Sequence, residues 1–189
     1  MMKSLFTGLL ALAFVCTSAA SDGALMHANP ATSRLAFSAW YESEQLPGRF
    51  NAFTVEVRRS PDHGNPTFLR VVVDMASADM NDADINDELK QADWFDTTAF
   101  PQAVFVSDTI TENGRSGFTA RGTLKLKGIS LDLDVPFDWE TTGDGAVMRG
   151  RLSLSRLAWQ VGMGEWEKDE TIGDEVGLEF NVELLAADT

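Results

Sequence analysis

Strict alternation of apolar and polar side chains along residues 131–139 most strongly constrains how this chain can fold. Between its apolar positions stand three aspartates and a proline. Successive side chains of a strand point to opposite faces, so the pattern predicts a strand with one dry and one wet face. Antiparallel sheets favour this arrangement. The apolar positions are Leu131, Leu133, Val135, Phe137 and Trp139.

The same period of two recurs along most of the chain. Residues 118–126 and 176–184 repeat it clearly. Turn-forming pairs such as Pro47-Gly48 and Lys127-Gly128 separate neighbouring runs. We therefore predict eight antiparallel strands, which pack either as a sandwich or as a closed barrel. Weaker versions of the pattern occupy residues 33–40, 50–58, 68–75, 102–110 and 146–157.

A single stretch breaks the strand pattern and predicts a helix over residues 83–91. Ile85 and Leu89 lie at helical spacing, and Asp82 and Asp84 suit the helix N-terminus. The acidic side chains also resemble part of a calcium-binding loop, but Asp87 stands where that loop needs a glycine. We therefore expect a capped helical crossover and no metal site.

Residues 1–20 carry the features of a secretory signal. Lys3 supplies a positive start, an apolar stretch follows, and small residues precede a cleavage site after Ala20. Removal of this segment would also remove Cys16, the chain's one cysteine. We expect an exported protein without disulfides, with a loose lead-in at residues 21–32 and one domain over residues 33–189. No later apolar run is long enough to span a membrane.

Charge and motif content exclude several function classes. The 15 Lys and Arg residues against 29 Asp and Glu residues give a net charge of −14, which disfavours nucleic acid. His27 lies in the expected lead-in and His63 in a predicted turn. The chain has no nucleophile elbow, phosphate loop or zinc-protease helix. We expect no enzymatic activity and no cofactor. An acid pair at Glu165 and Glu167 leaves a hydrolase open as an alternative.

Four segments together resemble the YceI-like family of exported polyisoprenoid-binding proteins. They are residues 47–53 (PGRFNAF), 87–105 (a helix, a Phe-Asp corner and a Pro-x-x-x-Phe strand), 122–129 (GTLKLKGI) and 156–166 (RLAWQVGMGEW). Many members carry Asp-Phe-Gly where this chain has residues 157–159, and many have a histidine near residues 40–42. These departures leave the fold intact and leave the ligand open.

The resemblance implies a lipocalin-like extended barrel in the periplasm, with no catalytic residues. Its lumen would hold a neutral isoprenoid chain, such as the tail of a quinone. The Gly164-Glu165-Trp166 variant resembles the branch often found beside membrane haem b cytochromes, which makes such a cytochrome a candidate partner.

The dry faces of the strands supply the candidate binding residues. They form either a solid core or the wall of an apolar tunnel, and the tunnel would bind a hydrocarbon tail through burial of its methylene groups alone. Methionines add adaptable packing where they face inward. The candidate lining residues are Phe37, Phe53, Val71, Phe105, Phe118, Leu133, Phe137, Trp139, Leu154 and Phe180.

Arg156 continues the inward phase of its strand and is the one charged candidate. A buried guanidinium needs partners. It either pairs with an acid or with loop carbonyls at the barrel mouth, or it meets a ligand head group. If the lumen is filled, the alternative function is a protein-interaction module that acts through the acidic surface and the aromatic loop at Trp159 and Trp166.

Overall fold

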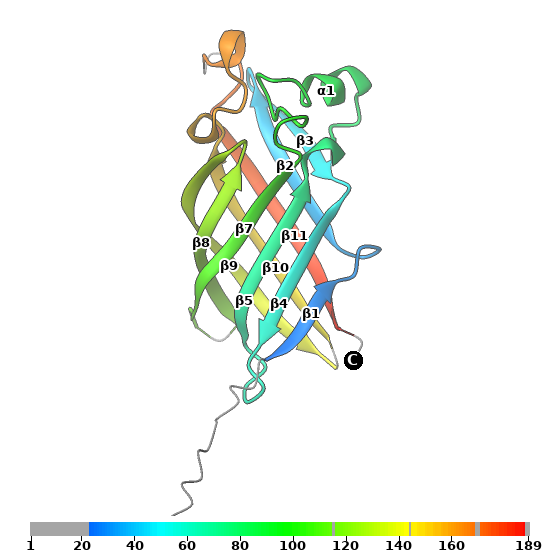
Figure 1. Ribbon diagram of the computed structural model, residues 1–189, viewed down its shortest axis with the longest axis vertical. Helices are drawn as coiled ribbons and strands as arrows, with labels where there is room; N and C mark the ends of the chain where they lie inside the picture. Colours follow the sequence, from blue (N-terminus) through cyan, green and yellow to red (C-terminus); the bar gives the residue numbers. More distant parts are fainter. Residues whose placement is uncertain (1–22, 115, 144, 169–170, 188–189) are drawn as a thin grey trace, which may run out of the picture.

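The computed structural model describes residues 23–187 except residues 115, 144 and 169–170. The predicted signal at residues 1–20, with Cys16 and the cleavage site after Ala20, lies outside the described residues. Within them, eleven strands form one sheet that curls into a barrel, with one α-helix at one end (Figure 1). In that part of the chain, no helix is long and apolar enough to cross a bilayer.

The strands are β1 (Ala24–Ala28), β2 (Arg34–Tyr41), β3 (Glu44–Phe50), β4 (Phe53–Arg59), β5 (Pro66–Asp74), β6 (Ala78–Asp79), β7 (Gln102–Glu112), β8 (Gly117–Leu126), β9 (Ile129–Thr142), β10 (Gly145–Ser155) and β11 (Glu175–Ala186). The helix is α1 (Ala83–Glu88), and short 3-10 turns are η1 (Met75–Ser77), η2 (Leu157–Trp159) and η3 (Gly164–Trp166). We call the end that carries α1, η2 and η3 the lid end and the opposite end the base.

Eight strands close the ring in the order β1, β4, β5, β7, β8, β9, β10 and β11. Each pair is antiparallel, and β11 returns to β1 through pairs such as Ala186 with Met26. Closure removes free sheet edges from this part of the wall. β11 also pairs with β2, so β2, β3 and β6 continue the wall toward the lid end. The predicted eight-stranded antiparallel barrel is confirmed.

The expected loose lead-in at residues 21–32 differs in the structure, because it contains β1. Met26 in this strand is fully buried, and β1 pairs with both β4 and β11. Five residues are too few to show a clear alternation, so the strand escapes detection in the sequence. Its stability comes from two neighbouring strands rather than from its own pattern.

The turn predicted at Pro47-Gly48 is wrong, because both residues lie inside β3. The chain reverses earlier, between Tyr41 and Glu44. Pro47 is tolerated because the far side of β3 pairs only at Arg49 and Phe50 among the described residues. A Cβ at Gly48 would lie 2.3 Å from the Phe37 ring, so the glycine lets that ring rest on the strand backbone.

The predicted helix at residues 83–91 is present but shorter, and it ends at Glu88. The Asp82 carboxylate accepts hydrogen bonds from the backbone N–H groups of Asp84 and Ile85, as expected for an N-cap. After Glu88 the chain tightens into successive turns, and Leu89 becomes buried against the barrel. The turn predicted at Lys127-Gly128 is confirmed as the two-residue link between β8 and β9.

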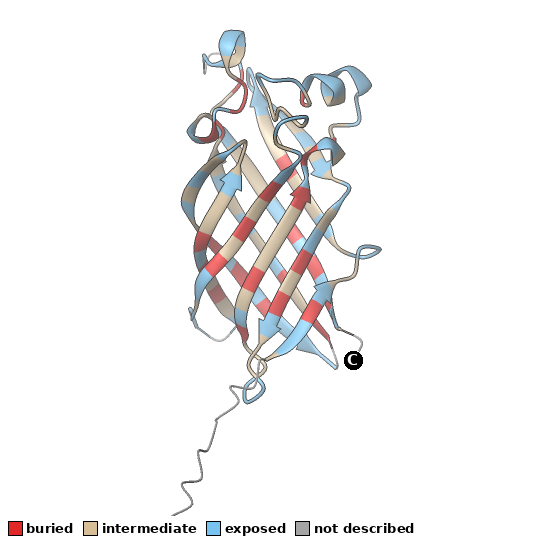
Figure 2. Cartoon of the chain, viewed as in Figure 1, coloured by how far each residue is buried: buried red, intermediate tan, exposed pale blue. Residues whose placement is uncertain are grey.

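Buried and exposed positions alternate along the strands, as Figure 2 shows. The inward side chains of the base half pack into one continuous cluster, in which Phe118 and Phe137 stack with ring centroids 5.7 Å apart. Its largest fully buried side chains are Met26, Val57, Leu69, Val182 and Leu184. Part of this cluster therefore fills the base of the barrel, and its other members border vacant space toward the lid end.

Candidate functional site

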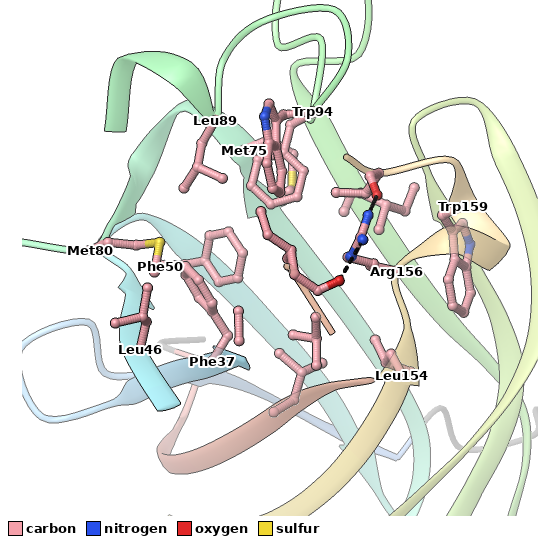
Figure 3. Close-up of a pocket in the computed structure, with 18 of the residues that line it drawn as sticks. Phe37, Leu46, Phe50, Met75, Met80, Leu89, Trp94, Leu154, Arg156 and Trp159 are labelled. Atoms are coloured by element: carbon pink, nitrogen blue, oxygen red, sulfur yellow. Dashed lines mark hydrogen bonds between the residues drawn. The ribbon is translucent and has the colours of Figure 1, made fainter. Parts of the chain in front are cut away.

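An apolar cavity of about 310 Å³ occupies the lid end of the barrel (Figure 3). Its wall comes from the inward faces of β2, β3, β5, β7, β8, β10 and β11, and its roof comes from the segments around α1, η2 and η3. Phe37, Phe50 and Phe95 form a chain of ring contacts along one side, with centroids 5.0 and 6.3 Å apart. The volume falls within the range of small-molecule binding pockets.

A second apolar cavity of about 110 Å³ lies deeper in the barrel. Five side chains line both cavities and form a neck between them: Leu35, Val73, Ala103, Leu124 and Leu178. Below the deeper cavity Phe118, Phe137 and Trp139, which line neither cavity, form a floor. The vacant lumen therefore begins at the lid and ends partway down the barrel.

The mouth of the upper cavity is marked by its exposed lining residues. Trp40 and Tyr41 at the end of β2 and Ile85 on α1 are each about two fifths exposed. Backbone hydrogen bonds between Glu42 and Thr171 and between Gly173 and Trp40 connect the β2–β3 hairpin to the segment that precedes β11. The mouth thus lies among this hairpin, α1 and η3.

Two segments form the roof: a helix lid (residues 80–100) and a loop lid (residues 156–168 and 171–173). The backbone carbonyl of Asp93 in the helix lid accepts N–H groups of Gly162 and Met163 in the loop lid, at 2.8 and 3.0 Å. The Lys127 ammonium, in the β8–β9 turn, donates to the same carbonyl at 3.1 Å and to the Gln160 carbonyl at 2.6 Å. Burial lowers the pKa of Lys127.

Arg156 holds the loop lid together from inside. Its Nε donates to the Gly173 carbonyl at 3.0 Å, and its two terminal nitrogens donate to four more carbonyls. These are the carbonyls of Val161, Gly162, Trp166 and Ile172, at 2.6 to 2.9 Å. A guanidinium has five N–H groups, so all five are engaged. Arg156 was expected either to pair with groups at the barrel mouth or to meet a ligand head group. In the structure it binds the loop carbonyls.

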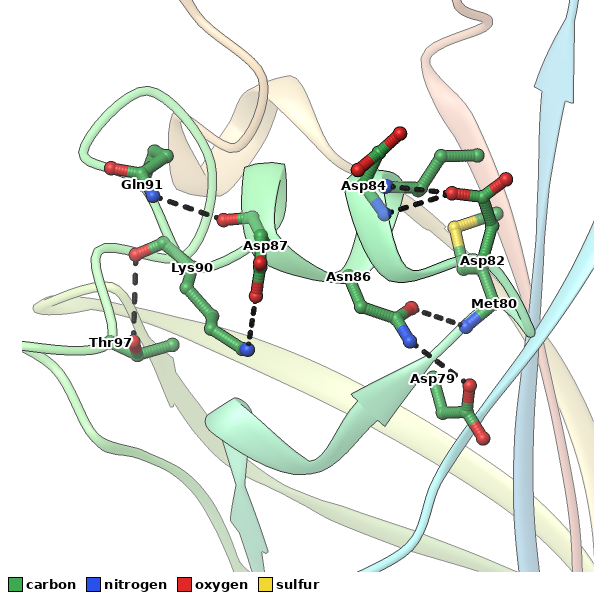
Figure 4. Close-up of polar contacts among 10 residues, drawn as sticks. Asp79, Met80, Asp82, Asp84, Asn86, Asp87, Lys90, Gln91 and Thr97 are labelled. Atoms are coloured by element: carbon green, nitrogen blue, oxygen red, sulfur yellow. Dashed lines mark hydrogen bonds and ion pairs between the residues drawn. The ribbon is translucent and has the colours of Figure 1, made fainter.

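A polar network anchors the helix lid to the barrel wall (Figure 4). Asn86 accepts from the Met80 N–H at 2.8 Å and donates to Asp79 at 3.1 Å. Asp79 also accepts from Asn51 and forms an ion pair with Arg49 at 2.6 Å. Hydrogen bonds to Asp79, first from the Asn81 N–H and then from Asn86 and Asn51, lower its pKa to about 2.

The structure divides the eleven sequence-predicted site residues into three groups by depth. Phe37, Leu154 and Arg156 line the upper cavity. Five line the deeper cavity, namely Phe53, Val71, Phe105, Leu133 and Phe180. Phe118, Phe137 and Trp139 belong to the base core and line neither cavity. The methionines could add adaptable packing only where they face inward: Met75 and Met80 line the upper cavity, Met148 lines the deeper one and Met26 lies in the base core, whereas Met163 lines neither cavity.

The cavity-lining residues that the sequence did not predict come from both the wall and the roof. Leu46 and Phe50 come from β3, and Leu89, Trp94 and Phe95 come from the helix lid. The helical spacing of Ile85 and Leu89 and the adjacent aromatic pair at residues 94–95 were the available signals. They predicted packing, but not that the packed face covers a cavity.

The fold and the cavity together define a lipocalin-like β-barrel with one roofed apolar lumen. The YceI-like domain model matches residues 26–184, and the chain belongs to this family. A UPF0312 protein of Shewanella baltica is 30% identical over 145 residues, which cover 71% of this chain and 72% of the relative. A UPF0312 protein of Vibrio parahaemolyticus is 27% identical over 168 residues, 83% and 86% of the two chains.

Solved structures share the barrel. The crystal structure of Burkholderia cenocepacia BcnA is 29% identical, with a TM-score of 0.78 over 82% of this chain and 98% of that one. A polyisoprenoid binding domain from Saccharophagus degradans, implicated in plant cell wall breakdown, has a TM-score of 0.71 at 14% identity, over 87% and 99% of the two chains. At that identity the second likeness concerns the fold alone.

Proposed function

We propose that the protein is a non-enzymatic periplasmic carrier that holds a neutral polyisoprenoid lipid, such as an isoprenoid quinone, in the barrel lumen. The observation that carries this proposal is the pair of adjoining apolar cavities beneath the lids. The polyisoprenoid-binding domain of Saccharophagus degradans has the same fold, which supports the same ligand class.

The energetics favour a hydrocarbon tail. Each methylene buried from water contributes about 0.8 kcal/mol, so each five-carbon isoprene unit adds a few kcal/mol. Loss of translational and internal freedom offsets part of this gain. A tail that fills both cavities would therefore bind without any charge or hydrogen bond.

A neutral head group fits the polar groups around the upper cavity. Arg156 is the one cation in its lining, and its five N–H groups already serve loop carbonyls. Glu88 is the one acid in the lining and lies exposed at the mouth. A quinone ring at the mouth would contact the exposed faces of Trp40 and Tyr41 without burying an unpaired charge.

The periplasmic part of the proposal depends on the signal at residues 1–20. We expect the protein expressed with its own N-terminus to appear in the osmotic-shock fraction of a Gram-negative host. Its intact mass should correspond to cleavage after Ala20. Full-length protein in the cytoplasmic fraction would contradict this part of the proposal without touching the lumen. A neighbouring haem b cytochrome is the proposed partner, and cross-linking in native membranes tests it.

Ligand binding itself is tested by extraction and titration. We expect organic extraction of gently purified protein to yield a prenylated species by mass spectrometry, and added quinone to change the emission of Trp94, Trp159 and Trp166, which line the upper cavity. Ala103→Phe fills the neck and should weaken quinone binding about tenfold. Ala76→Phe, on the exposed turn η1, is the matched control and should leave it unchanged.

The alternative, a protein-interaction module, predicts a barrel with a filled lumen. The filled base half accords with it, whereas the two cavities do not. Absence of any co-purifying lipid, together with no response of the tryptophans to quinone, would favour the interaction module and reject the carrier.

A further inference from the structure

Large apolar side chains gather on the surface at the mouth of the upper cavity. The described part of the chain has five exposed side chains of this kind, and three of them, Trp40, Tyr41 and Ile85, border this opening. The other two, Leu25 and Leu185, lie toward the base, at the opposite end of the barrel from α1 (Figure 1). A group of exposed apolar residues around one opening indicates a surface that another molecule covers. We call Trp40, Tyr41 and Ile85 the mouth patch.

Acidic side chains surround the mouth patch. They come from the β2–β3 hairpin, from α1 and from η3, and all of them are exposed. In the part of the chain that the structure describes, none of them forms an ion pair. We call this group the acidic rim, and its members are Glu42, Glu44, Asp84, Glu88 and Glu165.

The lids supply few cations that could neutralise the acidic rim. The helix lid has six acids and one lysine, Lys90, whose ammonium lies 2.7 Å from the Asp87 carboxylate. Arg156 is buried, and its N–H groups serve loop carbonyls. Lys168 is the exposed cation of the described loop lid. The mouth therefore presents an apolar centre surrounded by a negative potential.

We propose that the mouth patch and the acidic rim form a docking surface for a protein whose own face has an apolar centre surrounded by lysine and arginine side chains. Opposite charge guides such a partner to the mouth, and burial of the mouth patch holds it there. The inference deepens the proposed function by naming the docking face and the chemistry of the partner. It rests on that function only for the lipid that passes through the mouth.

A lipid bilayer is the competing occupant, because tryptophan and tyrosine also suit a membrane interface. The charges favour a protein. The acidic rim is repelled by anionic head groups, and a zwitterionic surface has no net positive charge to complement it.

Titration with a basic protein tests the docking surface. Reduced cytochrome c is the probe, because lysine side chains surround its apolar haem edge. At about 20 mM salt, amide shifts of the isotope-labelled protein should cluster at residues 40–46, 82–89 and 163–168. At about 150 mM salt the affinity should fall roughly tenfold, because screening shortens the range of the attraction.

Two double variants separate the acidic rim from net charge. Glu42→Gln/Asp84→Asn should weaken cytochrome c binding about fivefold. Asp62→Asn/Glu112→Gln is the matched control, because it removes the same two charges from exposed positions at the base. It should keep the affinity within about twofold of the wild type.

A second pair of variants tests the mouth patch. Ile85→Ser should weaken binding about fivefold, because an apolar side chain no longer becomes buried in the complex. Leu25→Ser is the matched control, since Leu25 and Ile85 are each 37% exposed and Leu25 lies toward the base. It should leave the affinity unchanged.

Three results would overturn the docking surface. They are no binding of cytochrome c at low salt, equal weakening by the rim and base variants, and binding of the lid end to phosphatidylcholine or phosphatidylglycerol vesicles in place of the protein probe. The lumen is judged separately by quinone titration, in which Glu42→Gln/Asp84→Asn should behave as the wild type does. A wild type that docks on cytochrome c but binds no quinone would reject the lumen proposal and leave the docking surface standing.

Discussion

Arg156 is a charged side chain that is only 4% exposed, and it sits in the wall of an apolar cavity. Such burial is costly unless every donor finds an acceptor. Here the acceptors are five carbonyls of the loop lid, so one side chain satisfies backbone groups along the whole loop. The residue therefore organises the loop that roofs the site.

Replacement of Arg156 by lysine should destabilise the protein, although the charge is kept. Lysine has three donors and no planar fork, so at least two carbonyls lose their partner. We expect a loss of about 3 kcal/mol in unfolding free energy, roughly 6–12 °C in melting temperature. Calorimetric melting measures it. Arg151→Lys on the exposed face of β10 is the control, and equal melting of both variants would contradict this role.

Asp79 makes part of the folded-state stability depend on pH. Its pKa falls from 3.8 to about 2, so its contribution is present above pH 3.8 and disappears as pH falls toward 2. We expect wild-type protein to melt above Asp79→Asn at pH 5, and the difference to vanish near pH 2. A pH series of thermal melts with Asp62→Asn as control measures it. A constant difference across the series would refute the assignment.

The lids are held to each other by backbone hydrogen bonds at Asp93, by the ring contact between Trp94 and Trp166, and by Lys127, which donates to both lids. Opening the roof must break the bonds at Asp93, whereas the barrel wall below stays paired. The roof is therefore the least stable part of the site and the natural place for motion.

Lys127→Met should loosen the roof and leave the barrel intact, because methionine keeps the apolar stem and removes the donors. A loss of about 1 kcal/mol corresponds to roughly fivefold faster amide exchange in residues 90–97 and 156–167. Hydrogen exchange with mass spectrometry measures it. Lys125→Met, exposed on β8, should leave the lids protected as in the wild type. Equal exchange in both variants would show that Lys127 is not a link.

Phe137 sets the depth of the lumen from the floor. Phe137→Ala should cost about 3–5 kcal/mol in unfolding free energy, because it leaves a cavity in the base core. The same variant should also prefer longer ligands. The ratio of its affinity for longer prenyl alcohols to its affinity for farnesol should be higher than the same ratio in the wild type. Phe137→Leu, which removes less volume, should fall between the two in both measurements. An unchanged preference for chain length in a folded variant would mean that the ligand ends above the floor.

At the scale of the whole molecule, β1 completes the ring. Met26→Asp should place an unpaired carboxylate in the core of the closing strand and cost on the order of 3–5 kcal/mol. Leu25→Asp, one residue earlier and 37% exposed, should be close to neutral. Chemical denaturation of both variants checks the prediction. A Met26→Asp variant as stable as Leu25→Asp would show that closure through β1 contributes little.

The long strands could be predicted from the sequence because one dry face leaves a clear period of two. β1, β3 and β6 could not, since they are short or contain Pro47-Gly48, and neighbouring strands hold them in place. The alternation of apolar and polar residues placed the side chains of Phe37 and Phe137 equally well on the dry faces of their strands. Only the fit of side-chain volumes determines that Phe37 borders vacant space while Phe137 fills the floor, and alternation carries no information about volume.

The roof contributions were harder still, because Trp94 and Val161 lie on connecting segments whose positions depend on contacts far along the chain. The acceptor that links the two segments is the carbonyl oxygen of residue 93, which every amino acid possesses. A substitution at that position can therefore change the side chain and still preserve the hydrogen bonds between the two lids. Homologues with dissimilar residues there can share the same backbone link between the lids, and comparison of their sequences would never reveal it.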